Sequence, residues 1–133
     1  DALPIYFCFW DLDINRMNQA SDMLFEYNDF TSFSKSRTQT KTNLCEIYKA
    51  GWEQHGHMLT FTIQANRFLR NMVRAIVGTL LDIGQGKLEP EDIRGIIESK
   101  DRSQAGYSVP PNGLFLSDIR YPDHLNLKPP QKI

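Results

Sequence analysis

Residues 66–84, NRFLRNMVRAIVGTLLDIG, constrain the fold more than any other segment of the sequence. When they are placed on a helix at about 100° per residue, the apolar side chains fall on one broad face. Asn66 suits an N-cap and Gly84 suits the position just after a helix, so the segment predicts a helix from Arg67 to Ile83. The side chains predicted to be buried are Phe68, Leu69, Met72, Val73, Ile76, Val77, Leu80 and Ile83.

The opposite face of this predicted helix is narrow and basic. Arg67, Arg70 and Arg74 are three and four residues apart, so they line up beside Asn71 and the bare backbone of Gly78. Cations near a helix N-terminus oppose the helix dipole, at a cost of about 0.3 to 1 kcal/mol each. A nearby carboxylate or phosphate would reverse that cost, and the arginine fork suits both anions. The alternative is that the arginines are solvated and only lay their stems over the core.

The remaining segments predict an antiparallel sheet with helices on one face. The residues QHG at 54–56 predict a turn that joins two strands into a hairpin, and Pro90 suits the first turn of a further helix. The order β-α-β-β-α-α-β is that of a split β-α-β, ferredoxin-like α+β fold. The predicted elements are a strand at 5–10, a helix at 14–27 capped by Asp13, strands at 43–52 and 57–64, helices at 67–83 and 90–99, and a strand at 114–121.

Basic residues are concentrated in the middle of the chain, although the net charge of the whole is only -1. Residues 34–74 hold seven basic and two acidic side chains, whereas the segment before them holds six acidic and one basic. Such segregation indicates a local anionic partner. The loop 34–43, SKSRTQTKTN, combines Lys35, Arg37 and Lys41 with hydroxyl side chains, a composition typical of phosphate contacts. A plain flexible loop has the same composition.

The composition is that of an ordinary single domain. The chain has 133 residues, of which 41% are hydrophobic, enough to bury a core without a metal or disulfide. It has no apolar run as long as a membrane span and no signal-peptide pattern, so a cytosolic location is expected. Cys8 and Cys45 suit reduced core thiols, and His55 and His57 lack further zinc ligands, so no metal site is predicted. Because the chain enters a strand soon after Asp1, we expect a piece of a longer protein.

Four segments, taken in order along the chain, resemble the tRNA pseudouridine synthase A family. ANRFLRNMVRAIVGTL at 65–80 is similar to the family segment ANxFLxxMVRxIVGTL, and NDFTSF at 28–33 is similar to a second one. KDR at 100–102 and GLFLSDIRYPD at 113–123 are similar to two more. The four motifs have the family order and spacing, so the resemblance covers nearly the whole chain.

The resemblance implies isomerisation of uridine to pseudouridine in the anticodon stem-loop of tRNA, without a cofactor or metal. The family uses a nucleophilic aspartate in a GRTDxGVH segment, and the target uridine must leave the RNA stack to reach it. No Arg-Thr-Asp sequence occurs in these 133 residues. The match is therefore to the C-terminal half of the synthase, and the N-terminal half is its implied partner. Residues 1–123 are interpreted as this C-terminal domain and 124–133 as a tail.

The resemblance also implies roles for residues of the active site. Arg74 has the position of the family's catalytic-cleft arginine, whose guanidinium would keep the nucleophilic carboxylate ionised and fix its direction. Leu114 corresponds to an apolar position near the bound base, and Gly113 before it permits a close backbone approach.

Further cations are expected to contact the RNA. Lys100 and Arg102 are placed at the RNA face by the resemblance alone. Arg67 and Arg70 are placed there by the phase of the predicted helix, which would turn them toward phosphate rather than toward the nucleophile. Family members are homodimers, so a homodimer is also implied.

Two other functions stay open at the level of sequence. A noncatalytic RNA-binding module of ferredoxin-like fold would expose aromatic side chains on its central strands, and the hairpin offers Phe61 but no RNP pattern. A dimerisation module would use an open sheet edge or a helix face. In NDFTSF, we expect Phe30 and Phe33 to plug an edge of the core, with stacking on bases as the alternative.

Overall fold

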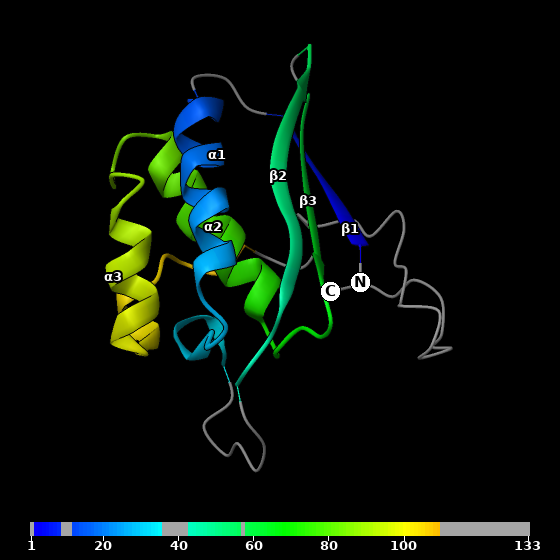
Figure 1. The fold of residues 1–133 in the computed structure, drawn as a ribbon. Coiled ribbons are helices and arrows are strands. Elements are labelled where there is room, and N and C mark those ends of the chain that lie inside the picture. Colours follow the sequence, from blue (N-terminus) through cyan, green and yellow to red (C-terminus); the bar gives the residue numbers. More distant parts are fainter. Residues whose placement is uncertain (1, 9–11, 36–42, 57, 110–133) are drawn as a thin grey trace.

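The computed structural model describes residues 2–8, 12–35, 43–56 and 58–109. Its strands form a three-stranded antiparallel sheet in the order β1-β3-β2 (Figure 1). The elements in chain order are β1 (Ala2–Cys8), α1 (Ile14–Met23), η1 (Leu24–Glu26), η2 (Thr31–Phe33), β2 (Ile47–His55), β3 (Met58–Ala65), α2 (Met72–Gly84), α3 (Asp92–Ser99) and η3 (Arg102–Gln104). The expected α+β fold is confirmed, while the predicted strand at 114–121 and the tail lie outside the described residues.

The hairpin of β2 and β3 forms because apolar and polar side chains alternate on either side of a tight turn. Gly56 in the turn has a φ of 63°, a left-handed conformation that glycine adopts without strain. In β3, Leu59, Phe61 and Ile63 are buried, and the residues between them are partly exposed. Trp52 of β2 pairs with Phe61 in register, and their ring centroids are 4.8 Å apart. Phe61 is therefore a core residue and does not offer its ring to a base.

All three labelled α-helices lie on the same side of the sheet (Figure 1). α1 packs on β2 and α2, while α3 packs on η2 and on α1 from outside. This confirms the expected arrangement of helices on one face. None of the helices in the described part of the chain is long and apolar enough to cross a membrane. The largest fully buried side chains are Phe30, Phe33, Phe61, Met17, Leu24, Ile63, Met72, Ile76, Leu80, Leu81 and Ile83.

α1 begins where the sequence predicts it. Asp13 caps the helix, because its Oδ1 accepts hydrogen bonds from the amides of Asn15 at 3.1 Å and Arg16 at 3.2 Å. The α-helix ends at Met23 and continues as the 3-10 turn η1, so the predicted end at Tyr27 includes that turn. The fully buried side chains of α1 are Met17, Ala20 and Ser21, and Leu24 of η1 is fully buried as well.

The N-terminus of α2 differs from the prediction. The helix begins at Met72 rather than at Arg67, because Asn71 has a left-handed conformation, with φ of 68°, that no continuous helix can contain. Of the three arginines predicted to share one helical face, only Arg74 lies in the helix. The helical alignment of Arg67 and Arg70 with it is therefore wrong.

Long-range contacts explain why residues 67–70 are not helical. The Asn66 side chain does not cap a helix but accepts a hydrogen bond from the Glu46 amide at 2.8 Å. The Arg70 carbonyl accepts from the Lys35 amide at 3.1 Å. Backbone pairing with two distant segments thus outweighs the helical propensity of this stretch.

The C-terminus of α2 lies close to its prediction. Gly84 is the last helical residue, and the left-handed glycine that follows the helix is Gly86, with φ of 82°. A Cβ on Gly84 would lie 2.4 Å from the Met17 Sδ, so the missing side chain lets α1 cross closely. The Gly84 carbonyl also accepts from the Asp13 amide at 3.0 Å, which joins the end of α2 to the start of α1.

Burial along α2 confirms the predicted apolar face. Of the eight side chains predicted to be buried, the six that lie in α2 are all buried. Before the helix, Leu69 is buried and Phe68 is partly buried against the core. Ala75, Gly78 and Thr79 are buried as well, so neighbouring elements cover α2 on more sides than an amphipathic surface helix would need.

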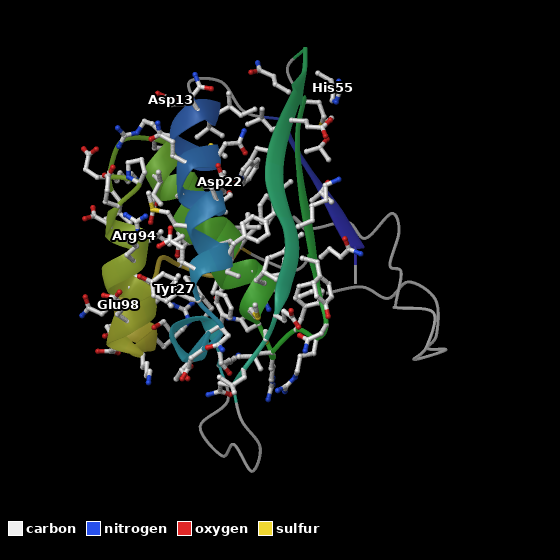
Figure 2. The ribbon with its side chains drawn as sticks, in the orientation of Figure 1. Asp13, Asp22, Tyr27, His55, Arg94 and Glu98 are labelled. Carbon is white, nitrogen blue, oxygen red and sulfur yellow. The ribbon has the colours of Figure 1, made fainter. Side chains whose placement is uncertain are left out.

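Side chains tie α3 to the chain around η1 (Figure 2). Arg94 makes a bidentate pair with Glu26 at 2.8 and 3.0 Å, and the Tyr27 hydroxyl donates to Glu98 at 2.6 Å. The hydrogen bond from Arg94 lowers the pKa of the Glu26 carboxyl, and the one to Glu98 raises the pKa of the Tyr27 hydroxyl. Such exposed pairs add little stability, so α3 depends mainly on its buried isoleucines.

The outer edge of the sheet is partly covered by a side chain. β2 is an edge strand, and the Asn18 carboxamide from α1 binds its backbone in both directions. Asn18 Oδ1 accepts from the Trp52 amide at 2.7 Å, and Asn18 Nδ2 donates to the Trp52 carbonyl at 3.1 Å. A strand from another chain would need these same groups, so edge-to-edge dimerisation is disfavoured at this position.

Candidate active site at the start of helix α2

Three of the family-like segments meet at one end of the fold. η2 contacts α2, α3 and η3, so the turn within 28–33 lies between the start of α2 and the chain that follows α3. Phe30 and Phe33 are both fully buried there, which confirms that they plug the core. The predicted site residues Arg74, Lys100 and Arg102 belong to the elements around this meeting point.

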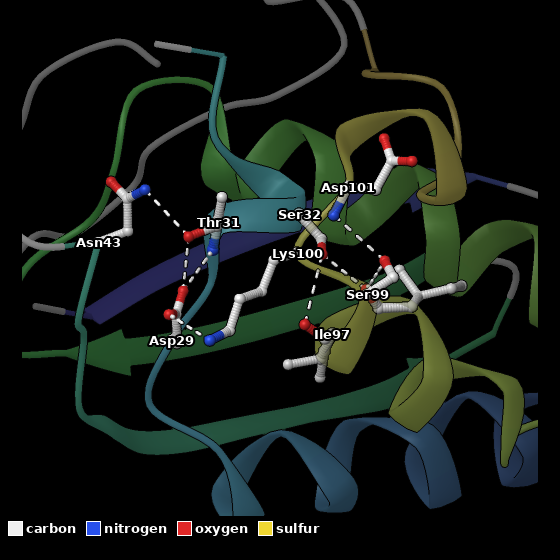
Figure 3. A network of polar contacts seen from close by, with 9 residues as sticks. Asp29, Thr31, Ser32, Asn43, Ile97, Ser99, Lys100 and Asp101 are labelled. Carbon is white, nitrogen blue, oxygen red and sulfur yellow. Dashed lines mark hydrogen bonds and ion pairs between the residues drawn. The ribbon is translucent and has the colours of Figure 1, made fainter. Parts of the chain in front are cut away.

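A polar network joins the 28–33 turn to the residues after α3 (Figure 3). Asp29 Oδ1 accepts from the Thr31 hydroxyl at 2.6 Å and the Thr31 amide at 3.1 Å, and Asp29 Oδ2 lies 3.6 Å from Lys100 Nζ. The Ser32 hydroxyl donates to the Ile96 carbonyl at 2.6 Å. Burial acts to raise the pKa of the Asp29 carboxyl, but the Thr31 hydrogen bonds and Lys100 outweigh burial and lower it.

Arg74 lies in the first turn of α2 and is half-buried. Its Nε donates to the Val109 carbonyl at 2.6 Å, and the Val109 amide donates to the Arg74 carbonyl at 3.1 Å. Within the described residues, no acidic side chain pairs with its guanidinium. One edge of the fork is therefore fixed by the backbone, and among the described residues no acidic side chain pairs with the two terminal nitrogens.

The backbone that holds Arg74 belongs to residues 105–109, called here the docked segment. It approaches α2 so closely that a Cβ on Gly78 would lie 1.7 Å from the Tyr107 carbonyl oxygen. The Gly106 amide donates to the Thr79 hydroxyl at 2.8 Å. The sequence marked Gly78 as bare backbone beside the arginines, and the structure gives the reason for it.

Arg102 holds the same docked segment from its other side. Its Nη1 donates to the Gly106 carbonyl at 3.0 Å and its Nη2 to the Ser108 hydroxyl at 2.7 Å. Asn71 Nδ2 donates to the same Ser108 oxygen at 2.5 Å. Two predicted site residues, Arg74 and Arg102, are thus brought together on one short stretch of chain. Sequence reasoning assigned no role to Ser108, and no motif marks it.

The other predicted cations lie near this site or outside the described residues. Lys35 and Arg70 are exposed, and the Lys35 amide donates to the Arg70 carbonyl. The Lys100 side chain is 62% exposed. Arg67 is partly buried, and its Nη1 donates to the Leu44 carbonyl at 3.3 Å. The remaining predicted site residues, Arg37, Lys41, Gly113 and Leu114, lie outside the described residues.

A separate pocket of about 480 Å³ opens beside the start of β2. Its charged residues are the acids Glu26 and Glu46, so it does not suit an anionic ligand. Cys45 in its wall is buried, and burial raises the pKa of this thiol to about 11, which makes it a poor nucleophile. In the part of the chain that the structure describes, no three histidine, cysteine, aspartate or glutamate side chains gather as a metal site.

Comparison with known proteins agrees with this arrangement of motifs. A family model described as tRNA pseudouridine synthase matches residues 23–122. A protein named tRNA pseudouridine synthase A from Parabacteroides distasonis is 58% identical over 114 residues, which cover 86% of this chain and 45% of that protein. One of the same name from Bacteroides thetaiotaomicron is 54% identical over 123 residues, covering 90% and 46%.

The chain spans about half the length of the curated relatives that it matches. The matched region nevertheless contains the 28–33 turn, the start of α2 and the residues after α3, which the fold brings together around Arg74. From this match we conclude that the chain belongs to the tRNA pseudouridine synthase family.

Proposed function

We propose that this chain forms the arginine side of the active site of a tRNA pseudouridine synthase, an enzyme that isomerises uridine to pseudouridine in the anticodon stem-loop of tRNA. The observation that carries the proposal is the state of Arg74. Its Nε is bound to a backbone carbonyl, and no acid of the described residues pairs with the guanidinium. An arginine fixed in this way, at the positive end of α2, is suited to hold a carboxylate from elsewhere.

The carboxylate in this proposal is the nucleophilic aspartate of an N-terminal half, as the family resemblance implies. Pairing with Arg74 would lower the pKa of that aspartate and keep it ionised as the nucleophile. The uridine is flipped out of the RNA, and its N1–C1′ bond breaks with the aspartate as nucleophile. The freed base turns, its C5 is joined to C1′ as the aspartate is released, and C5 loses its proton while N1 gains one. No cofactor or metal takes part in this scheme.

The tRNA-binding surface in this proposal surrounds the same end of the fold. Lys35 and Arg70 are exposed and adjacent, and Lys100 projects from the neighbouring turn, so these three can reach phosphates. Arg67 is proposed for the same role. Four further contacts are proposed from sequence alone. Arg37 and Lys41 would contact phosphate, and Gly113 and Leu114 would contact the base.

The proposal extends to assembly and location. From the family resemblance we propose a homodimer in the cytoplasm. Because Asn18 occupies the backbone of β2 at Trp52, the dimer should use a surface other than this sheet edge. Sedimentation with and without tRNA separates a catalytic dimer from a noncatalytic binding module, whose case is weakened by the burial of Phe61.

The test is substitution of Arg74 in the full-length protein. Breaking a buried arginine-carboxylate pair costs about 3 to 5 kcal/mol. If that cost falls on the transition state, Arg74→Ala should slow pseudouridine formation by roughly a hundred-fold to several thousand-fold. Arg74→Lys should be nearly as slow, because lysine lacks the bidentate fork. The rate is measured at saturating tRNA, with folding checked by circular dichroism.

Two controls complete this test. Arg94→Ala removes another arginine that pairs with a carboxylate, on the exposed side of α3, and should leave the rate unchanged. The chain alone, without an aspartate-bearing half, should form no pseudouridine, and adding that half should restore the activity. Near-normal turnover by Arg74→Ala, or any turnover by the chain alone, would reject Arg74 as the partner of an upstream aspartate.

A further inference from the structure

We infer that Arg102 is a positioning residue, which works with Asn71 and Ser108 to hold the docked segment so that its Val109 carbonyl orients Arg74. This inference rests on the proposed function, since it gives Arg74 its task. It assigns Arg102 a role inside the protein in place of the phosphate contact expected from the resemblance.

The geometry of Arg102 points to this role. Its two terminal nitrogens bind successive parts of the docked segment, the Gly106 carbonyl at 3.0 Å and the Ser108 hydroxyl at 2.7 Å. An arginine reaches two acceptors at once because its five donors are arranged as a rigid, planar fork. Because both terminal nitrogens of Arg102 donate to its own chain, only its remaining N–H donors could contact RNA.

Ser108 is the point where the two supports of the docked segment meet. Its oxygen accepts from Arg102 Nη2 and from Asn71 Nδ2, at 2.7 and 2.5 Å. Asn71 immediately precedes α2, whereas Arg102 lies in η3, beyond α3. The Ser108 hydroxyl therefore joins the start of α2 to the distant turn η3.

The inner side of the docked segment is fixed by α2 itself. Gly78 lets the Tyr107 carbonyl lie against the helix, and the Thr79 hydroxyl accepts from the Gly106 amide at 2.8 Å. With both sides held, the Val109 carbonyl has a defined place, from which it accepts from Arg74 Nε at 2.6 Å. Releasing the Arg102 side should let that carbonyl move and the guanidinium turn.

A turned guanidinium should harm the chemical step more than tRNA binding. Displacement of a catalytic group by about 1 Å can cost roughly a hundred-fold in rate, although the substrate still binds. Loss of a phosphate contact has the opposite signature, because it weakens tRNA binding and reduces the log-log salt slope by about one. The two roles of Arg102 are therefore separable by measurement.

The first experiment compares Arg102→Lys and Ser108→Ala in the full-length protein. We expect each to lower kcat by about ten-fold to a hundred-fold, with KM changed less than about three-fold and the salt slope of tRNA binding unchanged. The double variant should be little worse than either single one, because both changes release the same contact. Arg94→Lys, the same substitution at an arginine outside the site, is the matched control and should keep the normal kcat.

Ser108→Ala keeps the inference testable if Arg102→Lys folds poorly, since it removes one hydroxyl and no charge. A phosphate role for Arg102 predicts normal kcat in both variants and a smaller salt slope in Arg102→Lys alone. That result, or a normal kcat in Ser108→Ala when the protein is fully folded, would overturn the inference.

The second experiment does not depend on activity. The Nε–H of Arg74 gives its own NMR signal in a 1H-15N spectrum, assigned by its loss in Arg74→Lys. We expect this proton to be protected from exchange in the normal protein and to exchange at least about ten-fold faster in Arg102→Lys and in Ser108→Ala. Unchanged exchange in both variants would reject the positioning role. If the normal protein forms no pseudouridine, the proposed function fails while this measurement still decides the role of Arg102.

Discussion

The two ends of α2 are built in different ways. At its C-terminal end, Gly84 packs against Met17 of α1, and the left-handed Gly86 ends the helix as short-range rules predict. At its N-terminal end, the strained Asn71 precedes the helix without capping it through its side chain. That side chain instead donates to Ser108, on a segment far along the sequence.

The two ends of α2 therefore have different requirements: close packing at the C-terminal end and a fixed side-chain orientation at the N-terminal end. The C-terminal end needs only to terminate and to let α1 cross, so apolar packing and glycine are enough. The N-terminal end holds the half-buried guanidinium of Arg74 in one orientation, which needs directional bonds from several parts of the chain. The left-handed residue Asn71 and the long-range polar contacts are both concentrated at that end.

The two ends of α2 should differ most in the cost of substituting their buried glycines. Gly78→Ala should destabilise the protein by about 3 kcal/mol or more, because the new methyl group meets the Tyr107 backbone and must displace the docked segment. Gly84→Ala should cost less, about 1 to 2 kcal/mol, because the new methyl group meets only side-chain atoms of Met17 and Leu12. Urea unfolding of both variants gives the two costs.

The same pair reports on function. Gly78→Ala should also speed exchange of the Arg74 Nε–H, whereas Gly84→Ala should leave that exchange as it is. Equal costs for the two glycines would show that the docked segment yields as easily as a methionine side chain, and would remove the contrast between the ends of α2.

A smaller effect is expected at the residue that precedes α2. Asn71→Ala and Asn71→Gly both lose the hydrogen bond to Ser108, at a cost of about 1 kcal/mol. Asn71→Ala should cost about 1 to 2 kcal/mol more than Asn71→Gly, because alanine is strained at a φ of 68°. Gln85→Ala, at the right-handed residue that caps the other end of α2, should change stability by less than about 0.5 kcal/mol. Thermal unfolding would contradict this if Asn71→Gly were as unstable as Asn71→Ala.

Much of the fold could be predicted because its signals are local. Asp13 caps α1, Gly56 lies in the hairpin turn although Gln54 and His55 of the predicted turn belong to β2, and the apolar face of α2 follows helical phase. The start of α2 could not be predicted in this way. The bonds that hold Asn66 and Arg70 come from residues 35 and 46, which no local pattern connects to them.

The candidate site likewise has one part that the sequence indicates and another that depends on tertiary packing. Arg74 was found by resemblance, and the structure adds what the resemblance lacks, namely the carbonyl that holds its Nε. Ser108 and Val109 lie in a loop with no periodicity, so their contacts depend on tertiary packing alone. The close approach of Gly78 to that loop is visible only once both are folded.

The smallest predicted effect concerns the charge on Asp29, in the network beside the start of α2. The pKa of its carboxyl is lowered from 3.8, because the Thr31 hydrogen bonds and Lys100 outweigh burial. A lowered pKa means that ionised Asp29 stabilises the fold above the unfolded-state pKa, and that this contribution is lost as the pH falls through the folded-state value. Asp29→Asn should therefore cost about 0.5 to 1 kcal/mol at neutral pH, a range typical of a partly exposed pair.

Measurement of thermal unfolding as a function of pH checks this sign. The difference in free energy of unfolding between the normal protein and Asp29→Asn should be constant near neutral pH and shrink below about pH 4. It should vanish once the Asp29 carboxyl is protonated in both the folded and the unfolded state. Asp22→Asn, at an exposed aspartate of α1, controls for the general effect of removing one negative charge. A difference that grows as the pH falls would mean that the Asp29 carboxyl is held in its neutral form, and the network around Thr31 and Lys100 would then need the opposite assignment of charge.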